Sequence, residues 1–446
     1  MPNKRHARLA WIAAFALLLS LPAIDLVAGP KATKKKTTRK AAAPRVVDPA
    51  ISTVDGLRVL TLSGTPRERG KTHGRALAND IFKLIDEFLK ASHLSGGPRM
   101  YEMKLPQVTM AMSIPPLYRE EMEGMLEGMT EARKGKMRVK ALKRDLTLDD
   151  LVALTSIADS VGFGCSSFGA WGSLTKSGDT IVARNLDWHY IPSLAKMQLI
   201  IVHMPDKENN RLGWVSVGWP GQIGCYTGMN EQGVTVSMHD VNAGMPEQMS
   251  GFTPRALILR DAIEHARAES AEDDIFGVLR NHTVLVGNNI PVGVPYVEGA
   301  QAPPFMVFEY DGRRNLSGGV QLNQADRLRT AADAIAAAGE QKTEQFGIAT
   351  NHYCSRSSPT RCNRYERLEK ALKSRVEDAK PLTVNDAFKM LGTVGQTTKG
   401  DEDGLVTYHA VVFEPKRRTM KVAFSKGKAS ATKSRLHSLS LLTLLK

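Results

Sequence analysis

The N-terminal part of the chain has apolar residues at the spacing of helices. Residues 46–160 are predicted to be mostly helical, because apolar residues recur there every three to four positions. Thr147 is the expected N-cap of the last helix in this region, since acidic residues fill the first turn that follows it. The segments with this spacing are 76–91, 116–134 and 148–158.

The pattern changes near residue 165, where short apolar runs separated by turn residues replace the helical spacing. Strands predominate up to about residue 245, and helices and strands mix from there to residue 424. Strands in two blocks with helices between them predict an α+β fold, in which two packed sheets are flanked by helices. The expected strands are 166–174, 180–186, 198–203, 212–217, 234–239, 283–286, 304–310, 408–413 and 418–424, and the expected helices are 253–266, 271–279, 324–338 and 384–391.

The net charge of +14 is concentrated near the two ends of the chain. Residues 1–45 contain ten Lys and Arg against one acid, and residues 421–446 contain six Lys and Arg and no acid, so the body is close to neutral. A nucleic-acid-binding domain carries its basic residues as a patch or stripe on a folded face. The distribution argues against a nucleic-acid partner and leaves basic tails that suit an envelope or membrane surface.

The N-terminus has the features of an export signal. Basic residues precede the apolar run Leu9–Ile24, which is short for a membrane span, and small residues follow at Ala28-Gly29. We expect residues 1–28 to be a signal peptide and residues 29–50 a basic disordered linker, which is too poor in apolar residues to fold. The protein is therefore expected to be periplasmic or secreted, or membrane-anchored if the signal is uncleaved.

The four cysteines of this chain do not make a disulfide scaffold. Cys354 and Cys362 lie in one loop-like stretch and could pair, whereas Cys225 has no obvious partner and Cys165 would remain a free thiol. No cysteine belongs to a CxxC motif, and no HExxH or similar spacing occurs. Neither a metal nor another cofactor is expected.

The segment around Gly164-Cys165 carries the candidate chemistry. A predicted strand begins at Cys165, and a short hairpin brings it opposite Arg184 and Asp187. An ordinary thiol is only a few per cent thiolate near neutral pH, so it needs a base or a positive field. If Cys165 were the first residue of a mature chain, its own α-amine would be that base. Arg184 would then stabilise the thiolate, and Asp187 would orient the ammonium.

Two considerations weaken this hypothesis when only the residues are used. Arg184 and Asp187 point to opposite faces of a regular strand, so the strand must end or bulge near Asn185-Leu186 for both to reach the cysteine. A cysteine that begins a strand is usually a small buried hydrophobe, and an Arg-x-x-Asp pair usually lies on the surface. The segment alone does not separate an inert cysteine from a nucleophile.

Five motifs, in order along the chain, resemble those of the N-terminal-nucleophile hydrolases. The resemblance is to the penicillin acyltransferase-like group (the isopenicillin N acyltransferase family), related to bile-salt hydrolases and acid ceramidases, and it covers most of residues 57–425. The motifs are Gly64-Thr-Pro-Arg-Glu-Arg-Gly-Lys-Thr-His-Gly, Cys165-Ser-Ser-Phe with Arg184-Asn185-Leu186-Asp187-Trp188, Trp219-Pro-Gly-Gln-Ile-Gly with Tyr226-Thr-Gly-Met-Asn-Glu-Gln-Gly-Val, Thr350-Asn351-His352, and the hairpin at 408–424.

The resemblance implies a four-layer αββα sandwich and a precursor that cleaves itself between Gly164 and Cys165. Residues 51–164 would form a mostly helical α chain and residues 165–425 the catalytic β chain, and the two chains would stay associated. Residues 426–446 would form a basic C-terminal tail.

The resemblance also assigns roles near the Thr-Asn-His motif. Asn351 corresponds to the side-chain amide that donates to the tetrahedral oxyanion. The alternative for Asn351 is to cap the turn that follows it. His352 is expected to be structural, and Asn230 and Gly233 are expected to form only a hairpin turn, where residues with positive φ are favoured.

Two further positions of the family pattern stay open in this sequence. His239, Asp240 or a backbone N–H could supply the second oxyanion donor, because the asparagine found there in bile-salt hydrolases is absent. In this family an arginine usually follows the Thr-Asn-His loop. Three arginines of this sequence could take that position. These arginines are Arg361, Arg364 and Arg367, of which Arg364 is preferred.

Together these features predict a self-processing cysteine amidohydrolase or acyltransferase that forms a thioester on Cys165 with a small amide substrate. Export away from cytosolic coenzyme A favours hydrolysis over acyl transfer. One alternative is a non-catalytic, exported cell-envelope binding protein with an inert cysteine. Within the enzyme class, the alternative is a lipid amidase resembling acid ceramidase.

Overall fold

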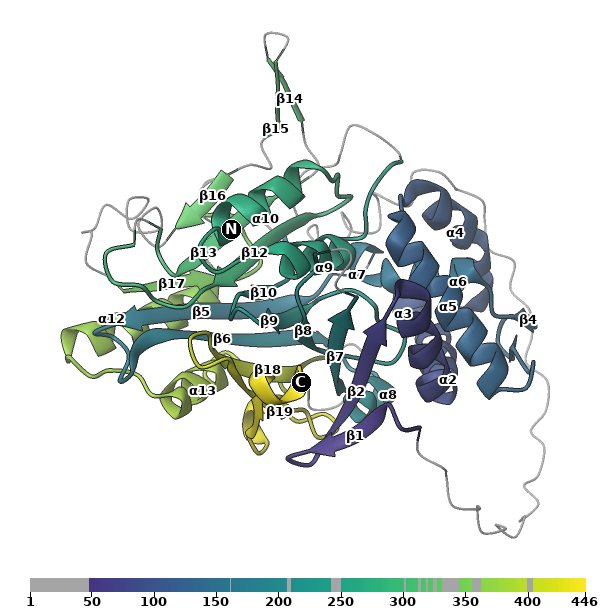
Figure 1. Ribbon diagram of the computed structural model, residues 1–446, viewed down its shortest axis with the longest axis horizontal. Coiled ribbons are helices and arrows are strands. Elements are labelled where there is room, and N and C mark those ends of the chain that lie inside the picture. Colours follow the sequence, from purple (N-terminus) through teal and green to yellow (C-terminus); the bar gives the residue numbers. More distant parts are fainter. Residues whose placement is uncertain are drawn as a thin grey trace, which may run out of the picture. The chain divides into compact units, whose positions relative to one another are not determined.

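The computed structural model describes most of the chain from residue 48 onward, and its elements carry the labels of Figure 1. The chain divides into the units Met1–Val46 and Val47–Lys446, of which only the second is described. The expected signal peptide, most of the linker, Arg361 and all but residues 327–330 of the helix expected at 324–338 lie outside the described residues. The described residues are 48–160, 162–206, 210–241, 250–300, 302–311, 314–317, 320–323, 327–330, 345–354, 362–398 and 404–446.

Helices make up most of the region before Cys165, as predicted. A capping box begins the longest of them, α2, in which Glu68 Oε2 accepts a hydrogen bond from Thr65 N at 2.8 Å. Thr147 is the N-cap of α6, as expected from the acidic residues after it. The helices are α2 (Pro66–Lys90), α3 (Ser92–Ser95), α4 (Pro98–Ala111), α5 (Pro116–Ala132), α6 (Leu148–Thr155) and α7 (Ile157–Ser160), and the short strands β3 (Arg138–Val139) and β4 (Arg144–Asp145) lie between α5 and α6.

Ten strands of the described chain form one sheet, called the large sheet. They follow the order β1-β2-β7-β8-β9-β10-β12-β13-β16, and β11 pairs with β12 beside this path. The β1–β2 hairpin precedes the helical region, and β2 runs parallel to β7, so both expected regions of the chain contribute to one sheet. The strands are β1 (Ile51–Val54), β2 (Leu57–Gly64), β7 (Leu199–Pro205), β8 (Trp214–Gly218), β9 (Thr227–Asn230), β10 (Thr235–Ser237), β11 (His239–Val241), β12 (Gly287–Gly293), β13 (Phe305–Tyr310) and β16 (Arg327–Thr330).

A second, six-stranded sheet of the described chain, called the small sheet, contains the candidate nucleophile. Its order is β17-β5-β6-β18-β19-β20 with antiparallel neighbours throughout. The β5–β6 hairpin therefore lies inside the sheet, where strands on both sides fix its position. The strands are β5 (Gly164–Gly172), β6 (Gly178–His189), β17 (Phe346–Ala349), β18 (Leu405–Glu414), β19 (Thr419–Phe424) and β20 (His437–Ser440); β14 (Arg314–Ser317) and β15 (Val320–Asn323) form a separate hairpin.

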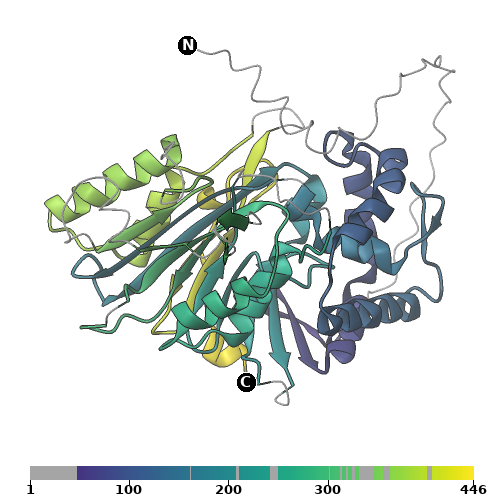
Figure 2. The same cartoon turned by 90° about the horizontal axis from the view of Figure 1, so that it is seen from above.

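The two sheets pack face to face and helices cover their outer faces, which gives four layers (Figures 1 and 2). Val182, Phe305 and Val411, from strands of both sheets, belong to one buried apolar cluster between the two sheets. Helices α2, α5, α9 and α10 cover the large sheet, and α12 and α13 cover the small sheet. The remaining helices are α8 (Pro192–Met197), α9 (Arg255–His265), α10 (Ala271–Arg280), α12 (Asn363–Glu377), α13 (Val384–Gly392) and α14 (Leu441–Leu444). The predicted αββα sandwich is confirmed.

One strand lies later in the chain than its sequence suggests. The apolar run at 283–286 was the expected strand, whereas β12 occupies Gly287–Gly293, which contains two glycines, two asparagines and a proline. Such a composition disfavours strands when it is judged locally. Pairing with β10 and β11 on one side and β13 on the other imposes the extended conformation.

The C-terminal segment expected as a basic tail is folded onto the small sheet. Strand β20 pairs with β19, and the side chains of Leu439 and Leu441 are buried in the cluster between the sheets. The apolar residues of this segment thus extend the sheet by one strand, although its charged residues are all basic.

Helices α2 and α5 cross so closely that glycine is required on both. A Cβ on Gly70 would lie 1.9 Å from the Glu121 carbonyl oxygen, and one on Gly74 would lie 2.0 Å from that of Met125. Gly70 and Gly74 are the two glycines of the segment Arg69-Gly-Lys-Thr-His-Gly74. Their spacing of four places both on one face of α2, so the motif is explained by helix packing.

Replacing Gly74 with alanine is expected to destabilise the protein by about 1–3 kcal/mol, because the new methyl group would force the two helix backbones apart. The measurement is the free energy of unfolding from urea titration. Gly277→Ala on α10 is the matched control: that glycine is helical and open, with no atom near its added Cβ, so the substitution should stabilise by about 0.5–1 kcal/mol. Equal effects of the two substitutions would contradict the packing argument.

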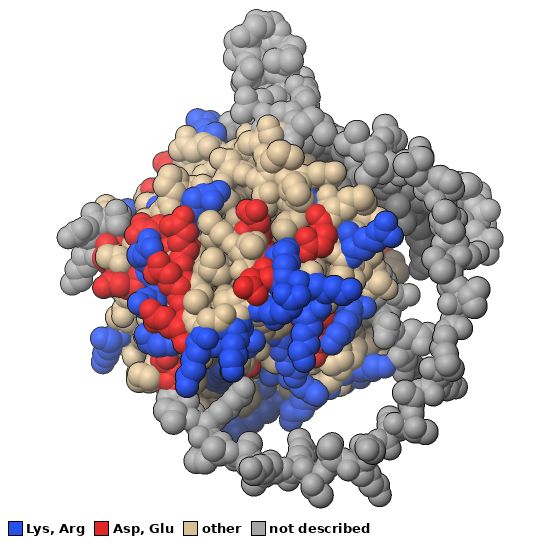
Figure 3. Space-filling model, turned by 90° about the vertical axis from the view of Figure 1, so that its right-hand side faces the viewer, with Lys and Arg blue, Asp and Glu red and all other residues tan. Residues whose placement is uncertain are grey.

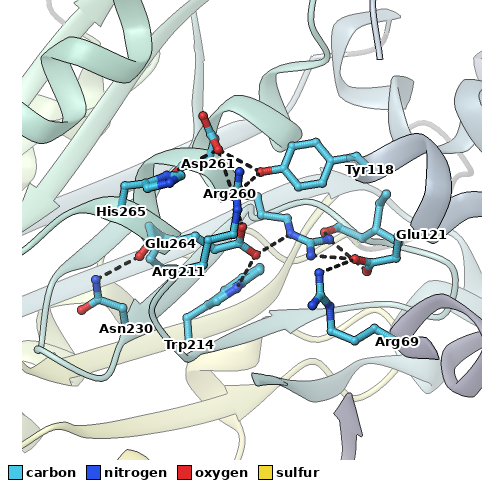
Figure 4. A network of polar contacts seen from close by, with 12 residues as sticks. Arg69, Tyr118, Glu121, Arg211, Trp214, Asn230, Arg260, Asp261, Glu264 and His265 are labelled. Atoms are coloured by element: carbon cyan, nitrogen blue, oxygen red, sulfur yellow. Dashed lines mark hydrogen bonds and ion pairs between the residues drawn. The ribbon is translucent and has the colours of Figure 1, made fainter. Parts of the chain in front are cut away.

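A buried ionic network joins the helical region to the catalytic region (Figure 4). Glu121 of α5 lies 2.7 Å from Arg260 of α9 and 3.1 Å from Arg69 of α2, and all three side chains are almost fully buried. Glu264 accepts from Arg260 Nε at 2.8 Å and completes the charge balance. Loss of one partner leaves a buried charge unpaired, which costs about 3–5 kcal/mol.

The outer face of the helical region carries charges of both signs (Figure 3). Ion pairs link α2 to α5 there: Arg67 to Glu123 at 3.8 Å and Lys71 to Glu131 at 2.7 Å. Some of the basic residues of α2 are thus paired with acids of α5. Among the described residues, no helix combines the length and the apolar character that crossing a membrane requires.

Candidate active site

Cys165 lies at the start of β5, fully buried, with its thiol beside a guanidinium group. Arg184 Nη2 is 3.4 Å from Cys165 Sγ, and the same guanidinium donates to the carbonyl oxygens of Tyr226 (2.8 Å) and Met238 (3.0 Å). The thiol itself donates to the Met238 carbonyl at 3.3 Å. Two main-chain carbonyls of the large sheet therefore hold the arginine against the cysteine.

Arg184 and Asp187 point to opposite faces of β6, and this strand continues without interruption past both. β6 stays paired with β5 as far as Asp187, which lies opposite Gly164. The irregularity lies in β18, on the other side of β6. The bulge expected near Asn185-Leu186 is therefore wrong. Arg184 approaches the thiol from the layer between the sheets, and Asp187 approaches the Gly164 backbone from the face that α12 covers.

Asp187 packs directly against Gly164. A Cβ on Gly164 would lie 3.3 Å from Asp187 Cβ and 3.7 Å from its Oδ2, so a larger residue would crowd the carboxyl group. Thr407 Oγ1 donates to Asp187 Oδ1 at 2.6 Å. Burial raises the pKa of Asp187 to about 6, despite the opposing effects of Arg364 and Thr407. Its charge therefore changes in weakly acidic solution.

Asn351 contacts the main chain on both sides of the Gly164–Cys165 bond. Its Oδ1 accepts from Cys165 N at 2.7 Å, and its Nδ2 donates to the carbonyl oxygens of Phe163 (2.9 Å) and Asp240 (2.7 Å). The amide group thus binds the nitrogen of the candidate scissile bond and a carbonyl one residue before it. This is more than a turn cap needs.

Arg364, the preferred of the three candidate arginines, lies in the site. Its guanidinium donates to the Cys165 carbonyl at 2.5 Å and to Asn351 Oδ1 at 2.7 Å, and it lies 3.5 Å from Asp187 Oδ2. Arg367 instead donates to a carbonyl at the end of α13. Arg364 therefore connects the nucleophile's backbone, the amide and the carboxylate.

Asp240 belongs to a buried ion-pair cluster beside the site. One of its oxygens lies 2.5 Å from Arg255 Nη1 and the other accepts from Phe163 N. Arg255 Nε also donates to Asp159 Oδ1 at 3.1 Å. Burial raises the pKa of Asp240 and that of Asp159, the latter to about 6. The cluster fixes the segment just before the Gly164–Cys165 bond.

His239 bonds to β5 and to β12. Its Nε2 lies 2.7 Å from Ser167 Oγ, and its backbone N–H donates to Asn288 Oδ1 at 3.1 Å. Both groups therefore have partners away from the Gly164 carbonyl. The identity of the second oxyanion donor stays a prediction, with His239, Asp240 and backbone N–H groups as the candidates.

The environment of the uncut chain keeps the Cys165 thiol neutral. Burial raises its pKa to about 12, and the favourable field of Arg184 only partly offsets this effect. The carboxyl groups of Asp240 and Asp187 raise the pKa further. The described residues contain no group of three or more His, Cys, Asp or Glu side chains that could hold a metal ion.

Some groups of the site have no signal in the sequence. The Tyr226 and Met238 carbonyls position Arg184 as backbone atoms, so residue type does not reveal them. Asn289 Nδ2 donates to the carbonyls on both sides of Asn351 and holds that turn in place, although its surroundings read as a loop. The ion pair between Arg255 and Asp159 joins residues that are far apart in the chain.

An apolar cavity of about 60 Å³ lies beside Phe163, on the side of the helical region. Its aromatic lining consists of Phe88, Phe163, Trp188, Trp219 and Tyr226, and helices α2, α6 and α7 also supply aliphatic side chains. The Phe163 ring lies 4.8 Å from that of Trp188 and 5.4 Å from that of Tyr226, measured between centroids. The residue two places before Cys165 therefore fills part of this aromatic site.

Comparison with known proteins shows similarity to one family over part of the chain. The family model described as acyl-coenzyme A:6-aminopenicillanic acid acyl-transferase matches residues 173–291. An uncharacterized protein of Archaeoglobus fulgidus is 25% identical over 230 residues (48% of this chain, 37% of the relative). Protein dcd1B of Dictyostelium discoideum is 22% identical over 241 residues (51% of this chain, 47% of the relative). The chain spans less than half the length of these curated relatives.

Several solved structures are similar at low identity. The N-acylethanolamine-hydrolyzing acid amidase ortholog of Caenorhabditis elegans aligns with a TM-score of 0.39 at 16% identity, covering 62% of this chain and 100% of its own. A mutant of conjugated bile acid hydrolase from Clostridium perfringens aligns with a TM-score of 0.38 at 13% identity, covering 63% and 94%. The family match over residues 173–291 makes the chain similar to this acyl-transferase family, and its ordered motifs and αββα layers resemble those of the penicillin acyltransferase-like N-terminal-nucleophile hydrolases.

Proposed function

We propose that the protein is a self-processing cysteine amidohydrolase or acyltransferase, which first cleaves its own Gly164–Cys165 bond. The observation that carries the proposal is the convergence of side chains from three separate segments on this one peptide bond. An inert buried cysteine would not require it. The converging groups are Arg184 at the thiol, Asp187 at Gly164, Asn351 at the Cys165 nitrogen and Arg364 at the Cys165 carbonyl.

Self-cleavage begins when Cys165 Sγ attacks the Gly164 carbonyl carbon. The C–N bond breaks, the proton of the thiol ends on the nitrogen, and the acyl group is left on sulfur as a thioester. An ionised Asp187 stabilises the positive charge that develops on this nitrogen. Water then attacks the thioester, which frees the Gly164 carboxylate and restores the thiol.

The cut supplies the base that the uncut chain lacks. The new α-amine of Cys165 has an ordinary pKa of about 7.7–8.0, so it accepts a proton from the thiol near neutral pH. Arg184 stabilises the thiolate that results, and Asp187 holds the ammonium. The same thiol then attacks the amide of a substrate, and Asn351 donates to the oxyanion.

The apolar cavity beside Phe163 supports an apolar acyl group on the substrate. At about 60 Å³ it is smaller than the roughly 150 Å³ that accommodates a benzene ring. Phe163 occupies the space beside it, and cleavage would leave this residue near a free chain end. When Phe163 withdraws, Trp188 and Tyr226 would bound a site large enough for an arylacetyl or medium-length acyl chain.

The two chains are proposed to remain together after cleavage. Glu121 lies before the cut and Arg260 after it, and their buried ion pair would bind one chain to the other. Strands β2 and β7, which also lie on either side of the cut, share six registered residue pairs. The N-terminal sequence supports export away from cytosolic coenzyme A, which favours hydrolysis over acyl transfer.

The proposal is tested on the purified full-length protein. We expect two chains of about one third and two thirds of the length on a denaturing gel, with Cys165 as a new N-terminus by mass spectrometry. The processed protein should then release amines from phenylacetyl and medium-chain acyl amides, in a panel that includes N-acyl amino acids, β-lactams, N-acylethanolamines and short peptides. A protein that stays one intact chain and cleaves none of these amides would favour the binding-protein alternative. A preference for amides with long acyl chains would favour the lipid amidase.

The rate of self-cleavage is expected to rise with pH up to about 6 and then to level off. Asp187 has a pKa raised by burial to about 6, so it is increasingly protonated below that pH and loses the charge that stabilises the nitrogen. Processing should slow about tenfold for each pH unit below this point. Gel time courses between weakly acidic and neutral pH measure it.

Asp187→Asn should remove this dependence and process slowly at every pH. Asp159→Asn is the control, because Asp159 titrates in the same range but pairs with Arg255. If the pH dependence survived in Asp187→Asn and disappeared in Asp159→Asn, the titrating carboxyl group would be Asp159, and the assignment to Asp187 would be wrong.

A further inference from the structure

Two free thiols lie around one imidazole, immediately beside the site but outside the proposed catalytic groups. Cys354 Sγ is 3.6 Å from His352 Nε2, and Cys362 Sγ is 3.5 Å from Thr350 Oγ1. Thr350 Oγ1 in turn lies 2.9 Å from His352 Nδ1. Cys362 is also a hydrogen-bonding neighbour of His352. Cys354 is buried, whereas Cys362 is partly exposed.

We propose that Cys354 and Cys362 form a redox-active dithiol, which thiol–disulfide exchange converts into an intramolecular disulfide. The oxidant is a low-molecular-weight or protein disulfide. Cys362 attacks one of its sulfurs, one thiol of the oxidant leaves, and a mixed disulfide forms. Cys354 then attacks Cys362 Sγ, the second thiolate of the oxidant leaves, and it takes up the proton that Cys354 loses. Two protein thiols are oxidised and one disulfide is reduced to two thiols.

The order of attack follows from exposure and charge. Cys362 is accessible to an external disulfide, and Cys354 is placed to resolve the intermediate. Burial by itself would raise the pKa of Cys362, but the hydrogen bonds with His352 and Thr350 lower it to about 6. A thiol with a pKa below neutral is mostly thiolate at pH 7 and is therefore the better nucleophile.

The dithiol is coupled to the site through the chain itself. Asn351 directly precedes His352, and Arg364 lies two residues after Cys362. Asn351 Oδ1 and Arg364 Nη2 are 2.7 Å apart. A disulfide between Cys354 and Cys362 would fix the distance between the two segments that carry these side chains, so oxidation should change the rate of amide cleavage.

The full-length protein allows a direct test by mass spectrometry. After equilibration with glutathione disulfide and alkylation of the remaining thiols, trypsin cleaves at Arg356 and Arg361, between the two cysteines. A disulfide then appears as two linked peptides, one ending at Arg356 and one comprising Cys362-Asn363-Arg364. Finding both cysteines alkylated and unlinked under these conditions would overturn the proposal. The readout is independent of catalysis, so its failure is distinct from failure of the proposed function.

Variants separate a reactive pair from two ordinary thiols. In the reduced protein at pH 7, Cys362 should react with iodoacetamide at least tenfold faster than Cys225, which is a fully buried free thiol elsewhere. His352→Leu should remove most of this difference. Cys354→Ala should form no linked peptides and should keep glutathione on Cys362 as a mixed disulfide, whereas Cys225→Ala should form the linked peptides and show the same change in amidase rate as the unmodified protein. A disulfide that forms without changing this rate would overturn the coupling to Asn351 and Arg364.

Discussion

Replacing Cys165 with alanine is expected to leave the protein as one intact 446-residue chain without amide-cleaving activity. The sulfur is the nucleophile in both proposed reactions, and its removal leaves no atom to attack the Gly164 carbonyl. The substitution should cost little stability, because the thiol occupies a small buried volume and its hydrogen bonds are weak. A denaturing gel measures processing, and amine release measures turnover.

Two variants make this result interpretable. Cys165→Ser keeps a hydroxyl in the same place and should process slowly, since serine is the weaker nucleophile without a strong base. Cys225→Ala removes the other fully buried thiol near Arg184 and should process at the normal rate. If Cys165→Ala were still cut after residue 164, another protease would be responsible, and the self-processing hypothesis would fail.

The sequence pattern predicted the main helices and several strands of the small sheet correctly, but it misplaced β12 and missed β20. Amphipathic spacing found α2, α5 and α6, because one face of each helix is buried against a neighbouring layer. Short runs between turn residues found β5, β6, β18 and β19, and of these β5, β6 and β18 are buried on both faces. β12 was placed too early, since its glycines and asparagines are held extended only by pairing on both sides. The strand at 437–440 was missed because the basic composition of residues 426–446 predicted a tail. Two leucines of this segment, Leu439 and Leu441, nevertheless pack inward.

The candidate site shows a similar division. Cys165, Arg184 and Asp187 followed from a local hairpin, whose register is set within a single stretch of sequence. Their approach from opposite faces did not follow, because strand parity fixes which face each side chain takes but not what lies on that face. The face of Asp187 holds α12, and with it Arg364. Only the folded chain shows that the Gly164–Cys165 bond, the proposed site of cleavage, lies between the two groups.

Asn351→Ala is expected to reduce both self-processing and amide turnover by about 10²–10³-fold, the cost of losing one oxyanion donor. The side chain binds Cys165 N and the Phe163 carbonyl, so its loss also frees the backbone on both sides of the cut. Initial rates of the two reactions, measured on protein whose thermal unfolding is unchanged, give the effect. Asn281→Ala, at the exposed end of α10, is the control for asparagine removal.

Asn351→Asp distinguishes the donor from the acceptor. The aspartate keeps an oxygen for Cys165 N and Arg364 but lacks the N–H group that would bind the oxyanion. It also adds a negative charge near Asp187, where the transition state already carries an oxyanion. The Asn351→Asp variant should therefore process itself and cleave amides no faster than Asn351→Ala does. If Asn351→Asp instead retained most of the rate, the role of Asn351 would be to position the Cys165 nitrogen, and the oxyanion donor would have to be a different group.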